Sequence, residues 1–354
     1  MDYIKGRGAQ INTHNQFFKE EHTLRNDFLN YCYAENEVAN SNKTSYLEIF
    51  PKTILNKVSS PDIGFGYSMN PYQGCEHGCI YCYARNTHEY WGYSAGLDFE
   101  QKILYKSNAA ELLEQKLKSK SWFAQNIMFS GNTDCYQPIE RKLEITRKML
   151  LVLLKYNHPV SIITKNALIL RDLDILKEMA KLNLVNVSIS ITSLSEETRR
   201  SLEPRTASIK KRLETVQILA ENNIPTNVMM APIIPAINSH EILSLSKKVS
   251  EIGASSIGFT MVRLNGAIGK IFTNWVEKTY PDRALKILHQ IEDCHNGNLN
   301  DSRFGTRMRG EGKIAEQIAN QFMLAKKLYF KNSKLPELNF NLFKKEEIHQ
   351  LKLF

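Results

Sequence analysis

Hydrophobic positions alternate between short runs and longer helical patterns from about residue 67 to residue 262. The short runs, typical of buried strands, are Tyr67–Asn70, Ile127–Phe129, Val160–Thr164, Val185–Thr192, Asn227–Ala231 and Ser256–Val262. Between them, apolar residues recur at helical spacing in a segment that starts at Asn108 and in Ile139–Tyr156, Leu173–Leu182, Lys210–Glu221 and the stretch from Ser239 to Gly253. We expect Asn108, with Glu111 three residues later, and Ser239 to cap their helices.

This alternation predicts an α/β fold. Strands that alternate with helices pair in parallel through right-handed crossovers. Six such units are two short of a closed eight-fold barrel, so we expect a partial, TIM-like barrel with a lateral opening that could admit a large substrate. In parallel α/β folds the chemistry follows the C-terminal ends of the strands, and functional residues are therefore expected directly after each strand.

The pattern changes on both sides of the predicted barrel, which spans residues 66–264. Residues 1–65 are expected to form a polar extension packed on the barrel, with a short strand in Lys52–Val58 and apolar anchors at Phe17, Phe18, Phe28, Tyr31 and Tyr33. Residues 265–354 are expected to form a mainly helical extension with a basic loop. Its helical patterns are Pro281–Cys294 and Lys313–Tyr329, and its tail, Leu335–Phe354, is expected to pack back.

The first predicted strand is followed by Cys75-Glu-His-Gly-Cys79-Ile-Tyr-Cys82, three cysteines within eight residues. Thiolates are soft ligands suited to zinc, copper(I) or iron–sulfur clusters. A 4Fe–4S cluster ordinarily takes four cysteine ligands, so three would leave one iron open to bind and activate a small molecule. The flat ring of Tyr81 could pack against a bound cofactor, and the neighbouring glycines allow the backbone to wrap closely around a cluster.

This C-x3-C-x-aromatic-C spacing resembles the cluster-binding motif of the radical S-adenosylmethionine (SAM) enzymes. The resemblance covers about residues 66–264 and implies that Cys75, Cys79 and Cys82 hold a 4Fe–4S cluster whose open iron binds SAM. In that family, reductive cleavage of SAM gives a 5′-deoxyadenosyl radical that abstracts hydrogen from a substrate. The resemblance also implies an electron donor such as flavodoxin or ferredoxin.

A zinc site is the alternative interpretation of these cysteines. It would use them together with His77 or His88. Zinc sites more often use two C-x2-C pairs that lie far apart in the sequence. The chain has no second pair, so the spacing favours the cluster.

Four stretches narrow the resemblance to spore photoproduct lyase and its photolyase-like relatives: Tyr81–Tyr83, Thr164–Lys165, Ser190–Ser193 with Glu203–Thr206, and Ala231–Ile233. By this match Lys165 and Ser190 are candidate SAM contacts, and Tyr83 matches a tyrosine of the hydrogen-transfer relay. That lyase also uses a cysteine just before the aspartate that follows strand two. This chain has no thiol there, and Cys135, directly after Asp134, is the candidate substitute.

Other strand ends add candidates by the family pattern. Gly131 and Asp134 lie where many radical SAM enzymes contact the SAM amino group, and Ala231 lies where backbone often holds adenine. In the fourth predicted strand, one face carries Asn186, Ser188, Ser190 and Thr192. Buried parallel strands are usually apolar on both faces, so this polar face indicates a site inside the barrel, unless the hydroxyls only satisfy nearby backbone groups.

Composition places the chain among ordinary globular proteins, with 354 residues, 42% hydrophobic and 23% charged. We expect no membrane span, because no run of 18 apolar residues is present, and the first residues lack an apolar signal region. The remaining cysteines, Cys32, Cys135 and Cys294, are scattered, which indicates a reducing cytoplasm.

The net charge of +9 is unevenly distributed. Residues 303–334 hold eight Lys or Arg and two Glu, a net +6. Arg303, Arg307 and Arg309 lie in a glycine-flanked loop there and are candidates for binding a polyanion such as nucleic acid. A solvated helix face explains the same charge without a partner.

Three functions follow from these patterns. The first is a radical SAM enzyme that acts on nucleic acid, and the second is a radical SAM enzyme that acts on a protein or small metabolite. The third is a zinc-stabilised nucleic-acid-binding protein without catalysis.

Overall fold

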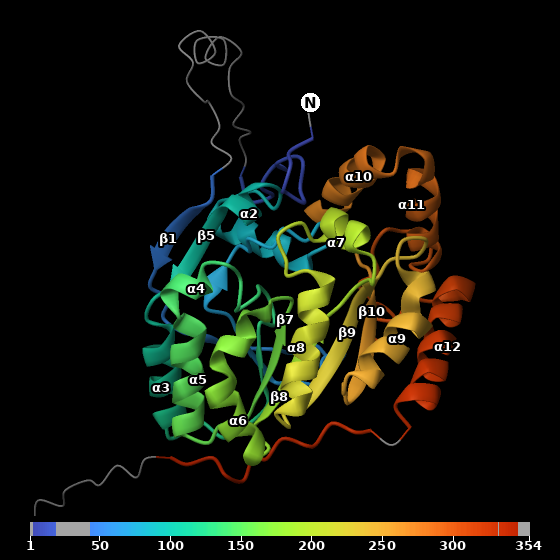
Figure 1. The fold of residues 1–354 in the computed structure, drawn as a ribbon. Helices are drawn as coiled ribbons and strands as arrows, with labels where there is room; N and C mark the ends of the chain where they lie inside the picture. Colours follow the sequence, from blue (N-terminus) through green and yellow to red (C-terminus); the bar gives the residue numbers. More distant parts are fainter. Residues whose placement is uncertain (1–2, 19–42, 332, 346–354) are drawn as a thin grey trace, which may run out of the picture.

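The main sheet of the protein has seven strands and is almost entirely parallel (Figure 1). A computed structural model describes residues 3–18, 43–331 and 333–345. The spatial order is β10-β9-β8-β7-β6-β3-β2, and only β2 runs antiparallel to its neighbour. The strands are β2 (Leu55–Lys57), β3 (Tyr67–Met69), β6 (Ile127–Phe129), β7 (Val160–Thr164), β8 (Val185–Ser190), β9 (Thr226–Ile233) and β10 (Ser256–Met261).

The two edges of this sheet do not pair with each other. β2 and β10 each have one neighbouring strand, so the described part of the chain forms an open sheet instead of a closed barrel. The six parallel strands are the six predicted from sequence, and the predicted α/β class is confirmed. The expected lateral opening corresponds to the gap between the two edges.

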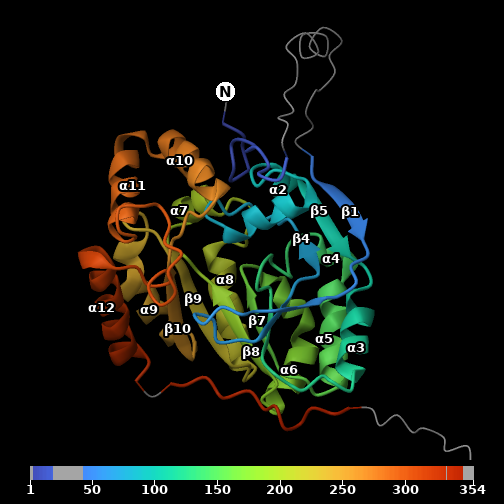
Figure 2. The same cartoon turned by 180° about the vertical axis from the view of Figure 1, so that it is seen from behind.

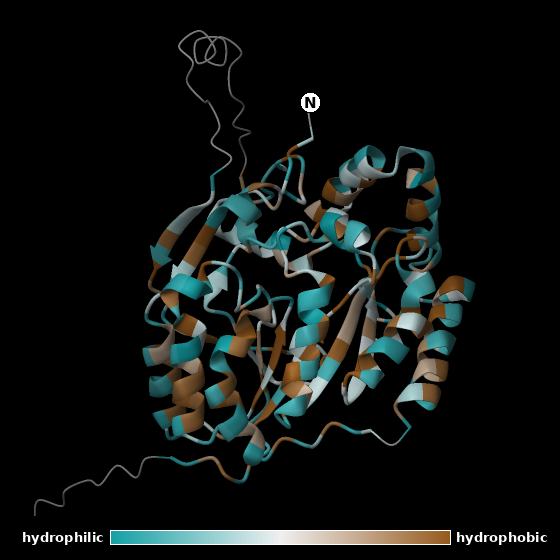
Figure 3. Ribbon diagram, in the orientation of Figure 1, coloured by the Kyte–Doolittle hydropathy of each residue, from teal (hydrophilic) through white to brown (hydrophobic). Residues whose placement is uncertain are grey.

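Amphipathic helices cover the outer face of the sheet (Figures 1 and 2). They are α3 (Ala109–Lys118), α5 (Ile145–Lys155), α6 (Leu173–Lys181), α8 (Ile209–Glu221), α9 (Ile242–Glu251) and α12 (Gly312–Tyr329). Leu113, Leu150, Leu176 and Val216 are fully buried on their inner faces. Figure 3 shows hydrophobic and hydrophilic residues alternating along these helices, as burial of one face requires.

A second layer lies at the C-terminal ends of the strands, and the sequence patterns predict little of it. A small sheet of order β1-β5-β4 lies on one side. Its strands are β1 (Ser45–Ile49), β4 (Tyr72–Gln73) and β5 (Lys102–Lys106), and beside it lie η1 (Tyr83–Trp91) and α2 (Asp98–Gln101). The rest of the layer comprises α7 (Glu196–Leu202), α10 (Ala267–Thr279), η4 (Pro281–Arg283) and α11 (Ala284–Asp293).

Three predictions about helix ends are wrong. The predicted helix over 139–156 is two helices, α4 (Glu140–Leu143) and α5, because Glu144 between them has a φ of 52°. Asn108 precedes α3, but its side-chain oxygen accepts no capping hydrogen bond, while its amide nitrogen donates to Pro51 O. Ser239 begins a short turn, η3 (Ser239–Glu241), and the residue that precedes α9 is Glu241.

The C-terminal tail crosses the N-terminal ends of the strands (Figure 2). Ser333 Oγ donates to Ser255 O at 2.8 Å, and Asn339 N donates to Asn183 O at 2.8 Å. Lys344 N continues the path to Tyr156 O at 2.9 Å. The expected packing of the tail is confirmed up to residue 345. Residues 346–354, and the anchors Phe28, Tyr31 and Tyr33, lie outside the described residues.

Across the described residues, we find no helix with the length and apolarity needed to cross a bilayer.

Candidate metal and cofactor site

The three predicted cysteine ligands lie on one loop between β4 and η1. Cys75 and Cys79 are each 7% exposed, and Cys82 is partly buried. Ile80 N donates to Leu202 O at 3.0 Å, which joins the loop to the end of α7. Gly78 has a φ of +67°, and a Cβ there would lie 2.7 Å from the Glu100 carboxylate. This position therefore requires glycine, both for its backbone conformation and for space.

The chemistry of these thiols fits a metal group. Burial raises the pKa of Cys79 to about 12 and that of Cys75 well above its ordinary value. Thiolates at these positions would therefore need a bound cation to compensate their charge. Three soft, buried donors on one loop match the ligand set of an iron–sulfur cluster.

The described residues do not offer the compact set that a zinc ion needs. No group of three or more His, Cys, Asp or Glu side chains in this part of the chain converges on a single ion position. His77 Nδ1 lies 3.3 Å from the Asp134 carboxylate, and His88 packs against Tyr93 and Phe99 with ring centroids 5.2 and 5.6 Å away. The geometry thus gives the zinc interpretation no support.

Asp134 braces the cysteine loop against strand β7. Its carboxylate accepts from Thr164 Oγ1 at 2.7 Å and Lys165 N at 2.8 Å, and it lies beside His77. Tyr136 N donates to it as well, at 2.9 Å. Although burial favours the neutral acid, His77 and these donors hold its pKa at about 2. Since its acceptor positions are occupied, the geometry favours a bracing role over the SAM contact expected from sequence.

Tyr81 is held by a buried ionic network that the sequence analysis did not identify. Its hydroxyl donates to Glu203, which also accepts from Thr192 Oγ1 at 2.9 Å and pairs with Arg212 Nη2 at 2.5 Å. Arg212 Nη1 in turn donates to Ser190 O at 2.9 Å. Glu203 and Arg212 have fully buried side chains. The network therefore ties the cysteine loop to the end of β8, where Ser190 lies.

Lys165 extends from the end of β7 toward the cysteine loop. Its Nζ lies 5.9 Å from the centroid of the Tyr81 ring. Burial opposes its charge, but the Cys79 and Cys82 thiols and the Glu203 carboxylate raise its pKa above the ordinary value. Within the described residues its ammonium group makes no hydrogen bond or ion pair. Lys165 is therefore charged and available to an incoming carboxylate.

The other predicted contacts lie at neighbouring strand ends. Ser190 ends β8 and is 2% exposed, and Ala231 lies within β9 on the side of the sheet that includes Asn227 and Met229. Tyr83 is 49% exposed, and its hydroxyl donates to Gly131 O at 2.5 Å. The fold thus brings the predicted Tyr83 and Gly131 into direct contact.

Cys135, the predicted substitute hydrogen donor, has no exposed surface. It is fully buried in the hydrophobic core beside Tyr72 and Tyr136. Its backbone is fixed by Ser130 Oγ, which accepts from Cys135 N at 2.8 Å, and by Thr146 Oγ1, which donates to Cys135 O at 2.6 Å. The thiol therefore behaves as a small core residue, and the predicted donor role is not supported.

The N-terminal segment forms a cap over the cysteine loop. Gly8 N and Ala9 N donate to the Glu100 carboxylate at 3.1 and 2.8 Å, and Arg7 Nη1 donates to Glu100 O at 2.9 Å. A Cβ on Gly8 would lie 1.8 Å from Gly78 O. Residues 7–9 therefore touch the loop directly, a contact that the sequence analysis could not have found.

Arg85 links this cap to a cysteine. Its Nη2 pairs with Glu100 Oε1 at 2.5 Å, and its Nε donates to Cys79 O at 3.0 Å. Both side chains of the Arg85–Glu100 pair are fully buried. The buried charges of Arg85 and Glu100 thus pair with each other, and the backbone of Cys79 is fixed from outside its own loop.

Two of the three predicted polyanion-binding arginines are paired within the chain. Arg303 pairs with Asp301, 2.9 Å from Nη2 to Oδ2, and with Glu311. Arg307 Nε pairs with Asp62 Oδ2 at 2.5 Å. The prediction that all three arginines meet phosphate is therefore not supported. Arg309 is exposed, with no side-chain partner among the described residues.

The Arg307 contacts bridge the open side of the sheet. Asp62 lies between β2 and β3, and it also accepts from Gly305 N at 2.8 Å. Met261 N, at the end of β10, donates to Met308 O at 2.9 Å. We call the contacts of Asp62 with Gly305 and Arg307 the seam clasp, because they join the loop beside one sheet edge to the turn beside the other.

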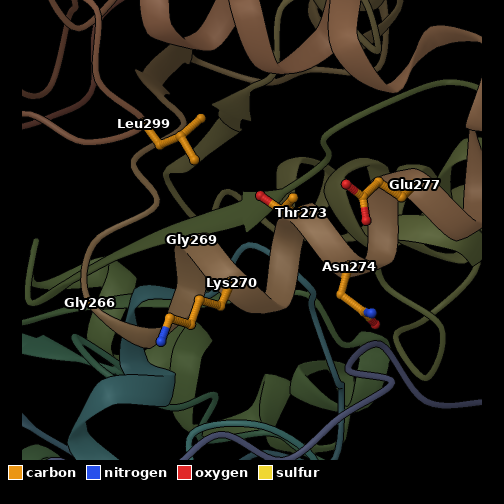
Figure 4. A pocket seen from close by; sticks show the side chains of 7 residues that line it. All are labelled: Gly266, Gly269, Lys270, Thr273, Asn274, Glu277 and Leu299. Atoms are coloured by element: carbon orange, nitrogen blue, oxygen red, sulfur yellow. The ribbon is translucent and has the colours of Figure 1, made fainter.

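A separate hollow lies on α10, away from the predicted ligands (Figure 4). It has a volume of about 500 Å³ and is lined by Gly266, Gly269, Lys270, Thr273, Asn274, Glu277 and Leu299. Figure 4 shows the side chains of Lys270, Thr273, Asn274 and Glu277 spread along the helix and that of Leu299 on a separate loop, so they do not converge on one point. The hollow contains none of the candidate residues and adds nothing to the site.

Comparison with known proteins gives a family and a fold. The profile of the Radical SAM superfamily matches residues 69–249. An uncharacterized protein of Mycobacterium tuberculosis is 30% identical over 241 residues, 67% of this chain and 71% of that protein. An uncharacterized protein of Methanocaldococcus jannaschii is 28% identical over 243 residues, 68% of this chain and 86% of that protein.

Solved structures of spore photoproduct lyase share the fold. The lyase complexed with dinucleoside spore photoproduct aligns with a TM-score of 0.57 and 15% identity, over 82% of this chain and 81% of that one. A mutant of the lyase with bound AdoMet and dinucleoside spore photoproduct aligns with a TM-score of 0.59 and 14% identity, over 84% and 83%.

Proposed function

Because the chain belongs to the radical SAM superfamily, we propose that it holds a 4Fe–4S cluster through Cys75, Cys79 and Cys82 and cleaves SAM reductively. The observation that carries this proposal is the set of three thiols, two buried and one partly buried, on one braced loop. The cluster would supply the electron that cleaves SAM to a 5′-deoxyadenosyl radical, which abstracts hydrogen from the substrate. A donor such as flavodoxin or ferredoxin would reduce the protein.

The chain's own residues would bind and orient SAM. Lys165, charged and uncommitted, would pair with the SAM carboxylate. Ser190 and the backbone near Ala231 would contact the rest of the molecule, and Tyr81 would pack against it. Asp134 and Glu203 would fix the positions of the cysteine loop and of these groups, because their carboxylates join elements that are distant in sequence. Tyr83, half exposed beside Gly131, is the candidate for passing a hydrogen atom to or from the substrate.

Nucleic acid is the substrate class we propose. Two observations support it: the net charge of +9, and the fold shared with a lyase whose structure contains a dinucleoside photoproduct. The absence of an exposed thiol near Asp134 argues against identical chemistry. A protein or small metabolite is the alternative substrate, and binding of single-stranded DNA by the wild type and by Arg263→Met separates these possibilities.

The reaction is tested by anaerobic reconstitution. Protein purified under nitrogen should bind about four irons per chain, the content of one 4Fe–4S cluster. With dithionite and SAM it should release 5′-deoxyadenosine, which is measured by chromatography. Stoichiometric zinc, or a full cluster that releases no 5′-deoxyadenosine, would contradict the proposed function.

The role of Lys165 is tested by Lys165→Ala. Loss of a charge-assisted hydrogen bond, about 1.5–3 kcal/mol, should weaken SAM binding roughly 10- to 100-fold. Binding is measured calorimetrically on reconstituted protein. Lys181→Ala is the matched control, because that lysine is 65% exposed and pairs only with Glu178 on α6. Equal SAM affinity in both variants would remove Lys165 from the site without affecting the assignment of the cysteines.

A further inference from the structure

Arg263 is a half-buried cation without an ionic partner. It follows β10, and its backbone is fixed on both sides, because Val262 N donates to Ile233 O and Leu264 N to Leu299 O, each at 3.0 Å. Val262 and Leu264 are buried, at 1% and 3% exposure. Within the described residues, the guanidinium of Arg263 makes no hydrogen bond or ion pair.

The carboxylates nearest to Arg263 are already used. Asp62 is engaged by Arg307 in the seam clasp, and Asp301 binds Arg303 through both oxygens. Burial, and then the like charge of Arg307, lower the pKa of Arg263 below its ordinary value. A partly buried charge without a counterion costs free energy. An anion bound beside Arg263 would remove that cost.

Two exposed aromatic rings lie close to the residues that surround this cation. Phe304 is 60% exposed, and the Arg307 guanidinium lies 4.4 Å from its ring centroid. Tyr83, 49% exposed, is close enough to Arg263 for the two to interact electrostatically, and its hydroxyl reaches the end of β6 through Gly131. Exposed aromatic rings close to a cation are the pattern by which proteins bind single-stranded nucleic acid, since bases stack on the rings while phosphates meet the cation.

We propose that Arg263 binds a backbone phosphate of a single-stranded nucleic acid at the open side of the sheet, with Tyr83 and Phe304 as stacking surfaces. The inference rests on the proposed function, for which it names the substrate class and the entry side. Tyr83 would then lie beside the bound strand, where a hydrogen-relay tyrosine is needed. The strand would pass under the seam clasp, so Arg307 would help to bound the site while Arg263 provides the free charge.

The test is binding of a short, fluorescent single-stranded DNA at several salt concentrations. Arg263→Met should weaken binding roughly ten-fold or more at low salt and lower the log–log salt slope by about one, the value for one phosphate contact. Arg263→Lys should retain part of the affinity, because it keeps the charge but loses the planar fork. Lys177→Met, which removes an exposed charge from α6, should bind like the wild type.

Two further binding measurements test whether Arg263 recognises phosphate and whether that phosphate belongs to a nucleic-acid strand or to a free nucleotide. A peptide nucleic acid of the same sequence, which has no phosphates, should bind weakly to the wild type and equally weakly to Arg263→Met. A nucleoside monophosphate should compete far less well than the oligonucleotide, because it offers one phosphate and one base.

Three results would each overturn the inference. They are an unchanged affinity and salt slope in Arg263→Met, equal binding of the DNA and the peptide nucleic acid by the wild type, and tighter binding of the nucleoside monophosphate than of the DNA. The unfolding temperature of Arg263→Met should not fall, because no partner of Arg263 is lost. A lower temperature together with weaker binding would mean that Arg263 is structural. Release of 5′-deoxyadenosine is measured separately, so the proposal of SAM cleavage and the proposal of a nucleic-acid substrate can be rejected independently.

Discussion

Cys79→Ala protein should retain little of the wild-type iron and release no detectable 5′-deoxyadenosine. Removing one of three thiols leaves two donors, too few to hold a 4Fe–4S cluster in a buried loop. Loss of groups that only support metal ligands already costs about 10- to 100-fold in affinity or activity, so loss of a ligand itself should exceed roughly 100-fold. Iron content, visible absorbance and 5′-deoxyadenosine are measured on protein reconstituted under the same conditions as the wild type.

The loop should stay folded in this variant. Cys79 O accepts from Arg85 Nε at 3.0 Å, and the neighbouring Ile80 N donates to Leu202 O at 3.0 Å, and neither contact uses the thiol. Cys294→Ala is the matched control, because Cys294 is also buried but lies outside the cysteine loop. Normal iron and activity in Cys79→Ala would remove the cysteine loop from the site, whereas losses in both variants would indicate unfolding.

The parallel strands could be predicted from the sequence because their signal is local. Val160–Thr164 and Ile127–Phe129 were predicted with the bounds that the structure shows. The layer over the strand ends gave a weaker signal, since β4 has two residues and α2 four. Such short elements are stable only through contacts with distant segments, as when β5 pairs in parallel with β1, 57 positions earlier at Lys102 and Ser45.

The candidate site shows the same difference between local and long-range sequence signals. The three cysteines are close in sequence, so their spacing alone indicates the chemistry. The bracing roles of Glu100, Asp134 and Glu203 could not be predicted from sequence, because each residue joins segments that are far apart, as Glu203 does with Tyr81 across 122 positions. A buried carboxylate surrounded by several donors has no local signature. These three residues fix the positions of the groups that the motif names.

The basic C-terminal segment shows why counting charges is insufficient. Its +6 suggested a polyanion partner, yet Arg307 pairs with Asp62, 245 positions earlier in the sequence. Arg263, a half-buried cation without an ionic partner among the described residues, lies outside that segment and gave no signal by itself. Charge becomes informative about binding only when the pairs are known.

Gly8→Ala should open the cap and expose the cysteine loop. The added Cβ would lie 1.8 Å from Gly78 O and 3.3 Å from Arg85 Nη2. The first contact is with backbone and cannot be relieved by a side-chain rotation, so residues 7–9 must move away. Overpacking of this kind costs typically about 1–3 kcal/mol, which raises the population of the open cap roughly 5- to 100-fold.

This opening should appear as faster loss of iron from reconstituted protein in air, because the cap covers the loop that carries the ligands. Gly6→Ala is the control within the same segment. Its φ of +78° also strains an alanine, but no atom lies within 4 Å of the added Cβ. If backbone strain in the segment were sufficient to open the cap, the two variants would lose iron equally fast. The cap would then not depend on the Gly8–Gly78 contact. If only Gly8→Ala loses iron rapidly while both unfold at similar temperatures, residues 7–9 protect the cluster by direct contact, and Gly8 is a glycine because Gly78 leaves no space for a side chain.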